Sequence, residues 1–418
     1  MFIFILVFYL IFCYIYRKNK VLLLLFLIQV ISVISAMLIN AETYGDDIST
    51  YYNVPYILAS TLMLILPWKK YGQITSVLRV NAGKVNLLTN FLLIISAFTF
   101  VVLLAVAIVV MVYLGDTNIN EYKDDTTNFY YTMLPFDVHW YLWARVLYTF
   151  SYFLIPLHFY HLYEGNRKKS VLCAFLSLNI VLYGLAFFSR WTIMLFVCLY
   201  GIMWFMFKNV LSQDDKKREM KAFFYVMIFL TIAFVSITLG RFSSDDGVST
   251  RYAERIPQQS YIQDPALYSI CDYLGQSSSI GVHLLNTYNG QHFGFKYPLM
   301  SLQNLFAGVG LCEPSTIFDL HQIHWKDEWD KFPGFTVYGV YDLGYIGAFI
   351  CCILYFFIVN KRNRKIRLQE LLAMVVLIQM PICSIFYSQA NEVLYDLMFL
   401  IPIWIFLQSG TQEKKIVR

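Results

Sequence analysis

The sequence predicts an all-α membrane protein, because of its composition and the length of its apolar runs. Of its 418 residues, 58% are hydrophobic and only 14% are charged, whereas soluble domains contain about 25% charged residues. Apolar runs such as 87–114 and 222–240 are unbroken, and an α-helix needs roughly 20 residues to cross a hydrocarbon core. A membrane β-barrel would show alternating segments of about ten residues instead.

Taken in order, the apolar runs predict about eleven membrane-spanning helices. The first run has no basic segment before it and no small-residue cleavage site after it. We therefore interpret it as an anchor and not as a signal peptide. The expected spans cover residues 2–16, 21–39, 54–67, 87–114, 138–162, 170–188, 191–208, 222–240, 336–360, 368–388 and 393–408.

The basic residues predict the orientation of these spans. Most of the 32 Lys and Arg residues fall in alternate connections, and such connections face the cytoplasm by the positive-inside rule. We therefore expect the N-terminus outside and the C-terminus in the cytoplasm. The net charge of +5 reflects this topology, and we expect no nucleic-acid partner. The basic connections are 17–20, 69–84, 167–169, 208–221, 361–367 and the tail 414–418.

The chain is expected to form a single membrane domain, 1–418, with one large external loop at 241–335. A connection of about 95 residues is too long to be a passive link. The runs Leu267–Leu274 and Ser279–Tyr288 are apolar enough for short helices at the membrane interface. The many aromatic residues of this loop either form an interfacial belt or line a groove for a sugar ligand.

Five arginines are predicted to lie at or near the outer membrane face. Arginine stays charged and presents a planar fork that matches phosphate. These side chains therefore suit a phosphate-bearing ligand, although snorkelling to lipid headgroups or pairing with acids of the loop would explain some of them equally well. The five are Arg145, Arg190, Arg241, Arg251 and Arg255.

Two of these arginines lie within or beside predicted spans. A charged side chain in such a place normally faces the bundle interior and has a partner. Glu392 and Asp396 are candidate partners for Arg145 and Arg190, because residues four apart share one face of the last span. A structural ion pair and a ligand-binding role both fit these two arginines.

Asp342 stands where the chain enters the span 336–360, within the run Tyr341-Asp342-Leu343-Gly344. An acid there is costly unless it is paired, faces a cavity or remains at the headgroup level. The glycines of the run are expected to let helices approach closely. We expect Asp342 to frame a site where the external loop meets the membrane.

Four of the seven histidines lie in the external loop. His321 and His324 come shortly before the Asp342 span and are followed by several acidic residues. A histidine or carboxylate here could act as a general base toward a hydroxyl; a solvated acidic loop is the alternative. The His-x-x-His spacing supplies no third ligand, so we expect no metal site. Cys271 and Cys312 share the loop and could pair in an oxidising compartment.

These features resemble the Wzy-type polymerases of bacterial O-antigen and capsular polysaccharide. Tyr341-Asp342-Leu343-Gly344, followed by Gly347, is similar to the family's Asp-aromatic-Gly-x-x-Gly span, with Leu343 in the aromatic position. Phe188-Ser189-Arg190 is similar to its mid-chain Ser-Arg element, followed here by Trp191. The layout of ten or more spans with a dominant outer loop in the C-terminal half is also similar.

The resemblance implies a GT-C-type membrane glycosyltransferase in the bacterial inner membrane that uses neither nucleotide sugar nor metal nor another cofactor. The donor would be a glycan on undecaprenyl pyrophosphate and the acceptor a lipid-linked repeat unit. Further implied partners are membrane lipids, a chain-length regulator and a flippase. The site would face the periplasm or exterior, with the five arginines available to the pyrophosphate, chiefly Arg190, Arg241 and Arg251. His321 or His324 would be the base, and Asp342 would shape the site.

Two other classes of protein fit many of the same features. An O-antigen ligase would use the same donor with a lipid A-core acceptor. A lipid-linked oligosaccharide flippase would not be an enzyme, and its charges should follow a path through the membrane centre. Here most charges outside the basic connections cluster near one predicted face beside the long loop, which favours chemistry at the surface.

Overall fold

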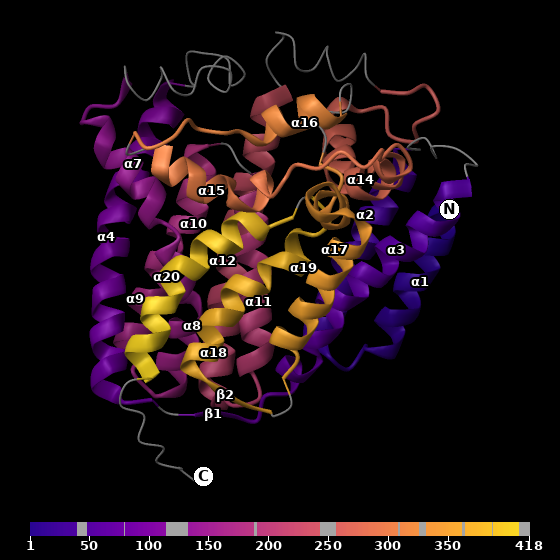
Figure 1. Ribbon diagram of the computed structural model, residues 1–418. Coiled ribbons are helices and arrows are strands. Elements are labelled where there is room, and N and C mark those ends of the chain that lie inside the picture. The colour runs from indigo at the N-terminus through magenta and orange to yellow at the C-terminus, as the bar shows by residue number, and fades with distance from the viewer. Residues whose placement is uncertain are drawn as a thin grey trace. The chain divides into compact units, whose positions relative to one another are not determined.

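The computed structural model is helical, in agreement with the predicted fold class (Figure 1). Every predicted span coincides with one helix or with two consecutive helices. Among the described residues, five helical segments are long and apolar enough to cross a membrane: Lys20–Leu38, Ala82–Val110, Arg167–Ala186, Phe335–Val359 and Ala390–Gln408. The structure describes residues 1–39, 48–78, 80–113, 133–187, 190–242, 256–307, 310–325, 332–361, 364–386 and 388–408.

The chain divides into two compact units, each of which is discontinuous in sequence. The first unit comprises Met1–Gln73, Ile256–Arg364 and Val376–Ile401. The second unit comprises Ile74–Arg255, Lys365–Val375 and Pro402–Arg418. The helix α18 (Leu368–Leu377) and the helix α20 (Ala390–Gln408) begin in one unit and end in the other.

The first unit consists of apolar helices from both ends of the chain and of helices from the 241–335 segment. Its core contains the rings of Tyr297 and Tyr338, which are stacked with their centroids 4.4 Å apart. The elements are α1 (Phe2–Ile15), α2 (Lys20–Leu38), α3 (Ile48–Ile65), the 3₁₀ helix η1 (Leu66–Gln73), α14 (Pro265–Asn286), α15 (Lys296–Ala307), α16 (Ile317–Trp325), α17 (Phe335–Val359) and α19 (Gln379–Cys383).

The helix α14 corrects one expectation about the 241–335 segment. The two short helices expected at 267–274 and 279–288 are one 22-residue helix. It begins at Pro265, after Asp264 accepts a hydrogen bond from the Leu267 N–H at 2.8 Å, as a helix N-cap commonly does. A Cβ atom at Gly275 would lie 2.7 Å from the backbone nitrogen of Ala36. Glycine at this position therefore allows α14 to pack directly on α2.

The second unit contains the longest helices and the only sheet in the described residues. In this sheet β1 (Ser76–Leu78) and β2 (Lys365–Arg367) pair in parallel, with Val77 opposite Ile366. The pairing joins two of the predicted basic connections. The helices are α4 (Ala82–Tyr113), α7 (Val138–Leu147), α8 (Phe150–Tyr163), α9 (Arg167–Ser177), α10 (Asn179–Ala186), α11 (Arg190–Phe207) and α12 (Gln213–Phe242).

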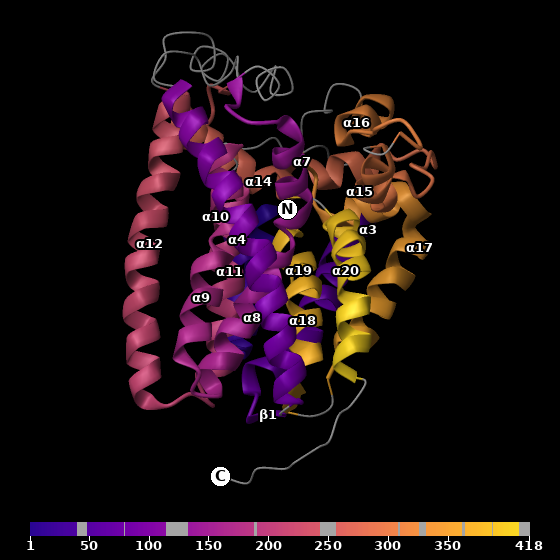
Figure 2. The same cartoon turned by 90° about the vertical axis from the view of Figure 1, so that its left-hand side faces the viewer.

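The helix α12 starts at Gln213, more than two turns before the apolar run 222–240 begins. Its first turn carries Asp214 and Asp215, which are favourable at a helix N-terminus. The polar stretch before the apolar run is therefore helical, and α12 packs against α11 (Figure 2). The eight cysteines are free, so Cys271 and Cys312 form no disulfide.

Candidate functional site

The helix α17 is broken inside the run Tyr341–Gly347. Gly344 has φ 68° and ψ 172°, a combination that is essentially restricted to glycine. The backbone carbonyls beside the break have partners outside the helix: the Phe293 N–H donates to the Tyr341 oxygen at 2.7 Å, and the Tyr56 hydroxyl donates to the Tyr345 oxygen at 2.6 Å. Gly344 is thus required for its backbone conformation and not only for close helix packing.

Asp342 lies directly before this break and is 6% exposed. The backbone N–H of Tyr297, the second residue of α15, donates to its carboxylate. Its Oδ1 atom has no hydrogen-bond partner among the residues that the structure describes. The hydrogen bond from Tyr297 joins the first turn of α15 to the broken helix. The hydrogen-bonding capacity of Asp342 is only partly used.

His321 is connected to the same helix through Tyr338, one turn before Asp342. The His321 Nε2 atom lies 3.0 Å from the Tyr338 hydroxyl, and the His321 ring lies 3.9 Å from the Trp325 ring centroid. A general base must reach the substrate proton, but the His321 side chain is 0% exposed. In this structure His321 therefore positions Tyr338 and has no surface for a substrate. His324 also belongs to α16, and its side chain lies outside the described residues.

Two accessible side chains border the break, and sequence reasoning did not nominate either of them. The Tyr288 hydroxyl lies 3.0 Å from the His292 Nδ1 atom. The ring of Tyr288 meets the ring of Tyr341 edge-on at 5.0 Å, and burial raises the pKa of its phenol. A Cβ atom at Gly344 would lie 3.4 Å from the His292 Cε1 atom. The only sequence signal for this pair was a histidine in an aromatic, glycine-containing stretch.

Arg145 lies on α7 in the second unit. The Tyr183 side chain is hydrogen-bonded to it, and its guanidinium carbon lies 5.7 Å from the Phe187 ring centroid. Its neighbours in the described part of the chain are thus aromatic. The two acids proposed as partners have other contacts in the first unit: Glu392 accepts from the Ser301 hydroxyl at 3.1 Å, and Asp396 accepts from the Gln379 amide at 3.4 Å.

The remaining predicted arginines also belong to the second unit, whereas Asp342 and both nominated histidines belong to the first. Arg190 is the first residue of α11, and Arg241 is the next-to-last residue of α12. Their side chains lie outside the described residues, as do Arg251 and Arg255 entirely. Within the first unit, His321 is hydrogen-bonded to Tyr338, which precedes Asp342 by one turn of α17.

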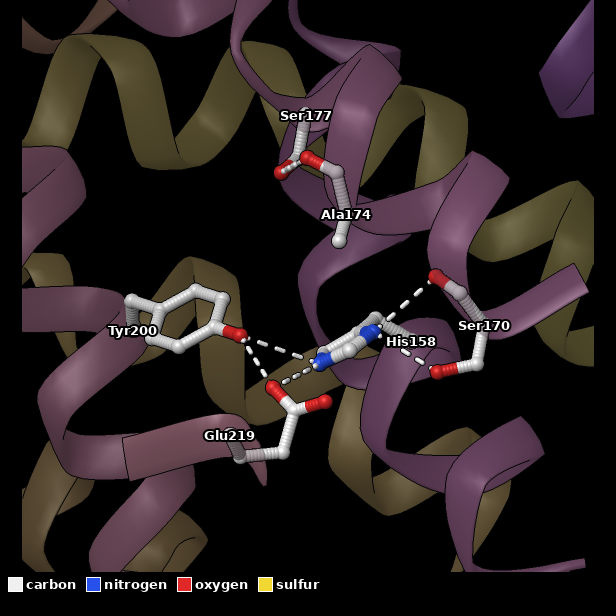
Figure 3. Close-up of polar contacts among 6 residues, drawn as sticks. All are labelled: His158, Ser170, Ala174, Ser177, Tyr200 and Glu219. Carbon is white, nitrogen blue, oxygen red and sulfur yellow. Dashed lines mark hydrogen bonds and ion pairs between the residues drawn. The ribbon is translucent and has the colours of Figure 1, made fainter. Parts of the chain in front are cut away.

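A second polar cluster, which the sequence did not suggest, joins four helices of the second unit (Figure 3). His158 on α8 lies with Nδ1 2.9 Å from both the carbonyl and the hydroxyl oxygen of Ser170 on α9. Its Nε2 atom lies 3.1 Å from Glu219 on α12 and 3.0 Å from the hydroxyl of Tyr200 on α11. The Tyr200 hydroxyl also donates to Glu219 at 2.8 Å.

The hydrogen bonds of this cluster favour a charged pair. A carbonyl oxygen only accepts, so the Nδ1 atom of His158 carries a proton. An imidazolium would also donate from Nε2 to the Glu219 carboxylate, which accepts from the Tyr200 hydroxyl as well. Burial raises the pKa of Glu219, but the hydrogen bonds and charge of His158 and the Tyr200 hydroxyl together hold this pKa below its usual value.

The two clusters therefore differ in what they can do. The first combines a broken helix, a carboxylate with an unused oxygen and an accessible tyrosine–histidine pair. The second is an ionic network in which one carboxylate oxygen of Glu219 is bonded by both His158 and Tyr200. Among the described residues, no three His, Cys, Asp or Glu side chains converge as a metal site. No protein-family model, curated protein or solved structure matches this chain.

Proposed function

We propose that this chain is a membrane glycosyltransferase that polymerises lipid-linked oligosaccharide repeat units, with its site at the break in α17. The break is the observation that carries the proposal. Irregular backbone within a spanning helix is tolerated where it is buried in protein or lines a cavity, and broken helices often form substrate sites in membrane proteins. Here the break falls inside the run by which the sequence resembles the polymerases.

The neighbourhood of the break supplies the chemical groups that such a site needs. Asp342 is a buried acid in a candidate span, and ionisable residues in that setting are usually functional. Tyr288 and His292 offer a hydroxyl and an imidazole at the accessible edge. Such groups recognise sugar hydroxyls, and an imidazole can accept the proton of an attacking hydroxyl.

The reaction that we propose balances without a metal or a redox partner. An acceptor hydroxyl oxygen attacks the anomeric carbon of the donor glycan, and the bond between that carbon and the lipid pyrophosphate breaks. The hydroxyl proton passes to a base, and the pyrophosphate leaves with the bonding electrons. Arg190, Arg241 and Arg251 are the groups that we assign to the leaving charge, with Arg145 and Arg255 as further candidates, because guanidinium groups stabilise developing phosphate charge.

The finer architecture belongs to the same proposal. We propose that all eleven apolar segments cross the bacterial inner membrane with the N-terminus outside and that the fold is of the GT-C type. The C-terminus and the basic connections would then face the cytoplasm, and the break in α17 would face the exterior. Cysteine labelling at 17–20 and at 288–292 from the two sides of the membrane tests this orientation.

The experiment that tests the function deletes the gene in its host and restores it in variant forms. Surface polysaccharide is then resolved by size, and lipid-linked material is extracted separately. A polymerase is indicated if the deletion leaves only single repeats on the surface acceptor. Intact polymer that remains on the lipid carrier would indicate a ligase instead. Absence of any repeat from the outer leaflet would indicate a flippase.

Two substitutions sharpen this experiment. Arg190→Ala is expected to abolish long polymer while single repeats persist, whereas Arg167→Ala is the matched control. Arg167 forms an exposed ion pair with Asp215 at 3.2 Å, and such pairs contribute at most about 1 kcal/mol. Asp342→Asn should reduce polymer while the protein keeps its melting temperature, because the amide oxygen can still accept from the Tyr297 N–H. Unchanged size ladders in both Arg190→Ala and Asp342→Asn would contradict the assignment of this site.

A further inference from the structure

The segment between α14 and α15 has an unusual backbone. Gly290 has φ 87° and Gly294 has φ 67°, and Phe295 follows with φ 64°. Phe295 is the only non-glycine residue with positive φ in the described part of the chain. A bulky residue in this region is strained, and backbone strain that persists is concentrated at functional sites. The position of Phe295 therefore requires an explanation beyond the connection of two helices.

The same segment is fixed to the break in α17. The Phe293 N–H donates to the Tyr341 carbonyl at 2.7 Å, and the Phe293 ring is buried, with its centroid 5.5 Å from that of Tyr341. Phe293 thus anchors the segment in the core. Phe295, two residues later, is 54% exposed. The left-handed backbone at Gly294 and Phe295 turns the second aromatic ring outward while the first stays buried.

The exposed side of the segment combines an apolar ring with neutral polar groups. Tyr288 and His292 are hydrogen-bonded to each other and border Gly344. Asn289 and Gln291 are exposed, and the Asn289 side chain accepts from the Gln291 N–H at 3.1 Å. This local bond fixes the turn and leaves the amide groups of both side chains at the surface.

An exposed aromatic ring does not need a strained backbone: Phe306 lies on the helix α15 with 49% of its surface exposed. Phe295 instead occupies a strained position next to donors and acceptors. An aromatic face surrounded by hydroxyl, imidazole and amide groups matches a sugar ring, which has apolar C–H faces and a polar edge. Apolar contact with a flat ring and a few placed polar groups is the usual composition of a small-molecule site.

We propose that Tyr288–Phe295 is a saccharide-binding loop that holds a sugar ring against Phe295 beside the break in α17. The Tyr288–His292 pair bonds the hydroxyls at the edge of that ring. The loop belongs entirely to the first unit. Which saccharide it binds rests on the proposed function, since the repeat unit of the host polysaccharide would be the ligand.

The test measures binding and polymerisation separately. The purified full-length chain in detergent is mixed with free oligosaccharide repeat units, prepared by hydrolysis of the host polysaccharide, and binding is followed by saturation-transfer NMR. Phe295→Ala is expected to weaken the apparent affinity about tenfold, as loss of an aromatic contact of this kind does. Phe306→Ala removes an equally exposed phenylalanine and is expected to bind as the wild type does.

Phe295→Gly keeps the test valid if the alanine variant folds poorly. Glycine adopts positive φ without strain, so this variant should have an unchanged or higher melting temperature and should still lose affinity. Wild-type-like binding by Phe295→Gly, or no binding by the wild type itself, overturns the saccharide loop.

The failure of this inference is distinguishable from that of the proposed function. If the wild type restores polymer in the deletion strain while Phe295→Gly and Phe306→Ala bind equally, the loop is wrong and the polymerase stands. If the wild type binds the oligosaccharide through Phe295 but deletion of the gene leaves polymer length unchanged, the saccharide-binding loop is supported and the polymerase function is wrong.

Discussion

The polar clusters of the two units differ in the hydrogen-bond partners that they give to an acidic side chain. Each contains an acid that connects different helices: Asp342 is buried, and the Glu219 side chain is 15% exposed. Glu219 in the second unit faces an imidazole and a phenol, and both lie within 3.1 Å of it. Asp342 in the first unit accepts a backbone N–H and has an unused oxygen among the described residues.

This difference indicates that the Glu219 cluster stabilises the fold and that the Asp342 cluster serves the function. A buried charge that is paired and hydrogen-bonded is costly to break, so the Glu219 network fixes α8, α9, α11 and α12 in one arrangement. A buried acid whose hydrogen-bonding capacity is not filled costs stability, and such groups persist where they serve a ligand or a reaction. We therefore expect substitutions in the second cluster to change stability, and substitutions in the first to change activity.

The largest expected effect comes from breaking the ionic network. Glu219→Ala leaves His158 buried without its carboxylate, and removal of one partner of a buried pair typically costs about 3–5 kcal/mol. Thermal unfolding in detergent measures this loss. At a temperature where the variant remains folded, its polymer ladder should match the wild type. A loss of polymer with normal stability would reverse the roles of the two clusters.

Gly344→Ala should have the next largest effect on stability. The alanine would have to adopt the backbone region that glycine occupies here, at a cost of about 1–3 kcal/mol. Unlike Glu219→Ala, it should also abolish polymer at permissive temperature, because it moves Asp342 and Tyr288 relative to each other. If Gly344→Ala melts earlier but still makes polymer of full length, the break is purely structural.

Acid should weaken the second cluster by a smaller amount, since protonated Glu219 can still bond Tyr200. The folded state holds the pKa of Glu219 below its usual value of 4.5. The carboxylate therefore contributes stability above that pH, and the contribution is lost as pH falls through the lower folded value. Melting temperatures of the wild type and Glu219→Gln between pH 7 and pH 3 measure it. The wild type should lose its advantage over the variant on the acid side, and parallel curves would be evidence against the charged pair.

The smallest effect is expected from substitution of a helical glycine that has space for a larger side chain. Gly201 lies within α11, and a Cβ atom built there meets nothing within 4 Å. Gly201→Ala should stabilise the protein by about 0.4–1 kcal/mol, because alanine restricts the unfolded chain and favours helix. Its melting temperature should rise while Gly344→Ala falls. Destabilisation by Gly201→Ala would mean that packing on α11 is tighter than the structure indicates.

Sequence patterns predicted the helices well because long apolar runs are typical of helices that avoid water, in lipid or in a protein core. The run 87–114 is α4, and 21–39 is α2. The same logic missed the join between α7 and α8 near Tyr148, since both sides of the join are apolar. It also missed β1 and β2, because strands of three residues depend on each other and carry no periodic signal.

The candidate site was only partly predictable for a related reason. Asp342 could be found because an acid in an apolar run is conspicuous. The sequence could not show which histidine is accessible at the site, because the burial of His321 and the exposure of His292 depend on how the segment folds. His158 and Glu219 meet across 61 residues, and no spacing rule links residues that far apart.

The parallel pair of β1 and β2 has a consequence for how the protein is made. Ser76 and its partner Lys365 are separated by nearly 290 residues, and chains grow at about 5–20 residues per second. After β1 emerges, the ribosome needs roughly 15–60 s to deliver β2. About half of the first unit, Ile256–Arg364, is synthesised in that interval. The second unit must therefore wait, with one strand unpaired, for a segment that arrives after the first unit is nearly complete.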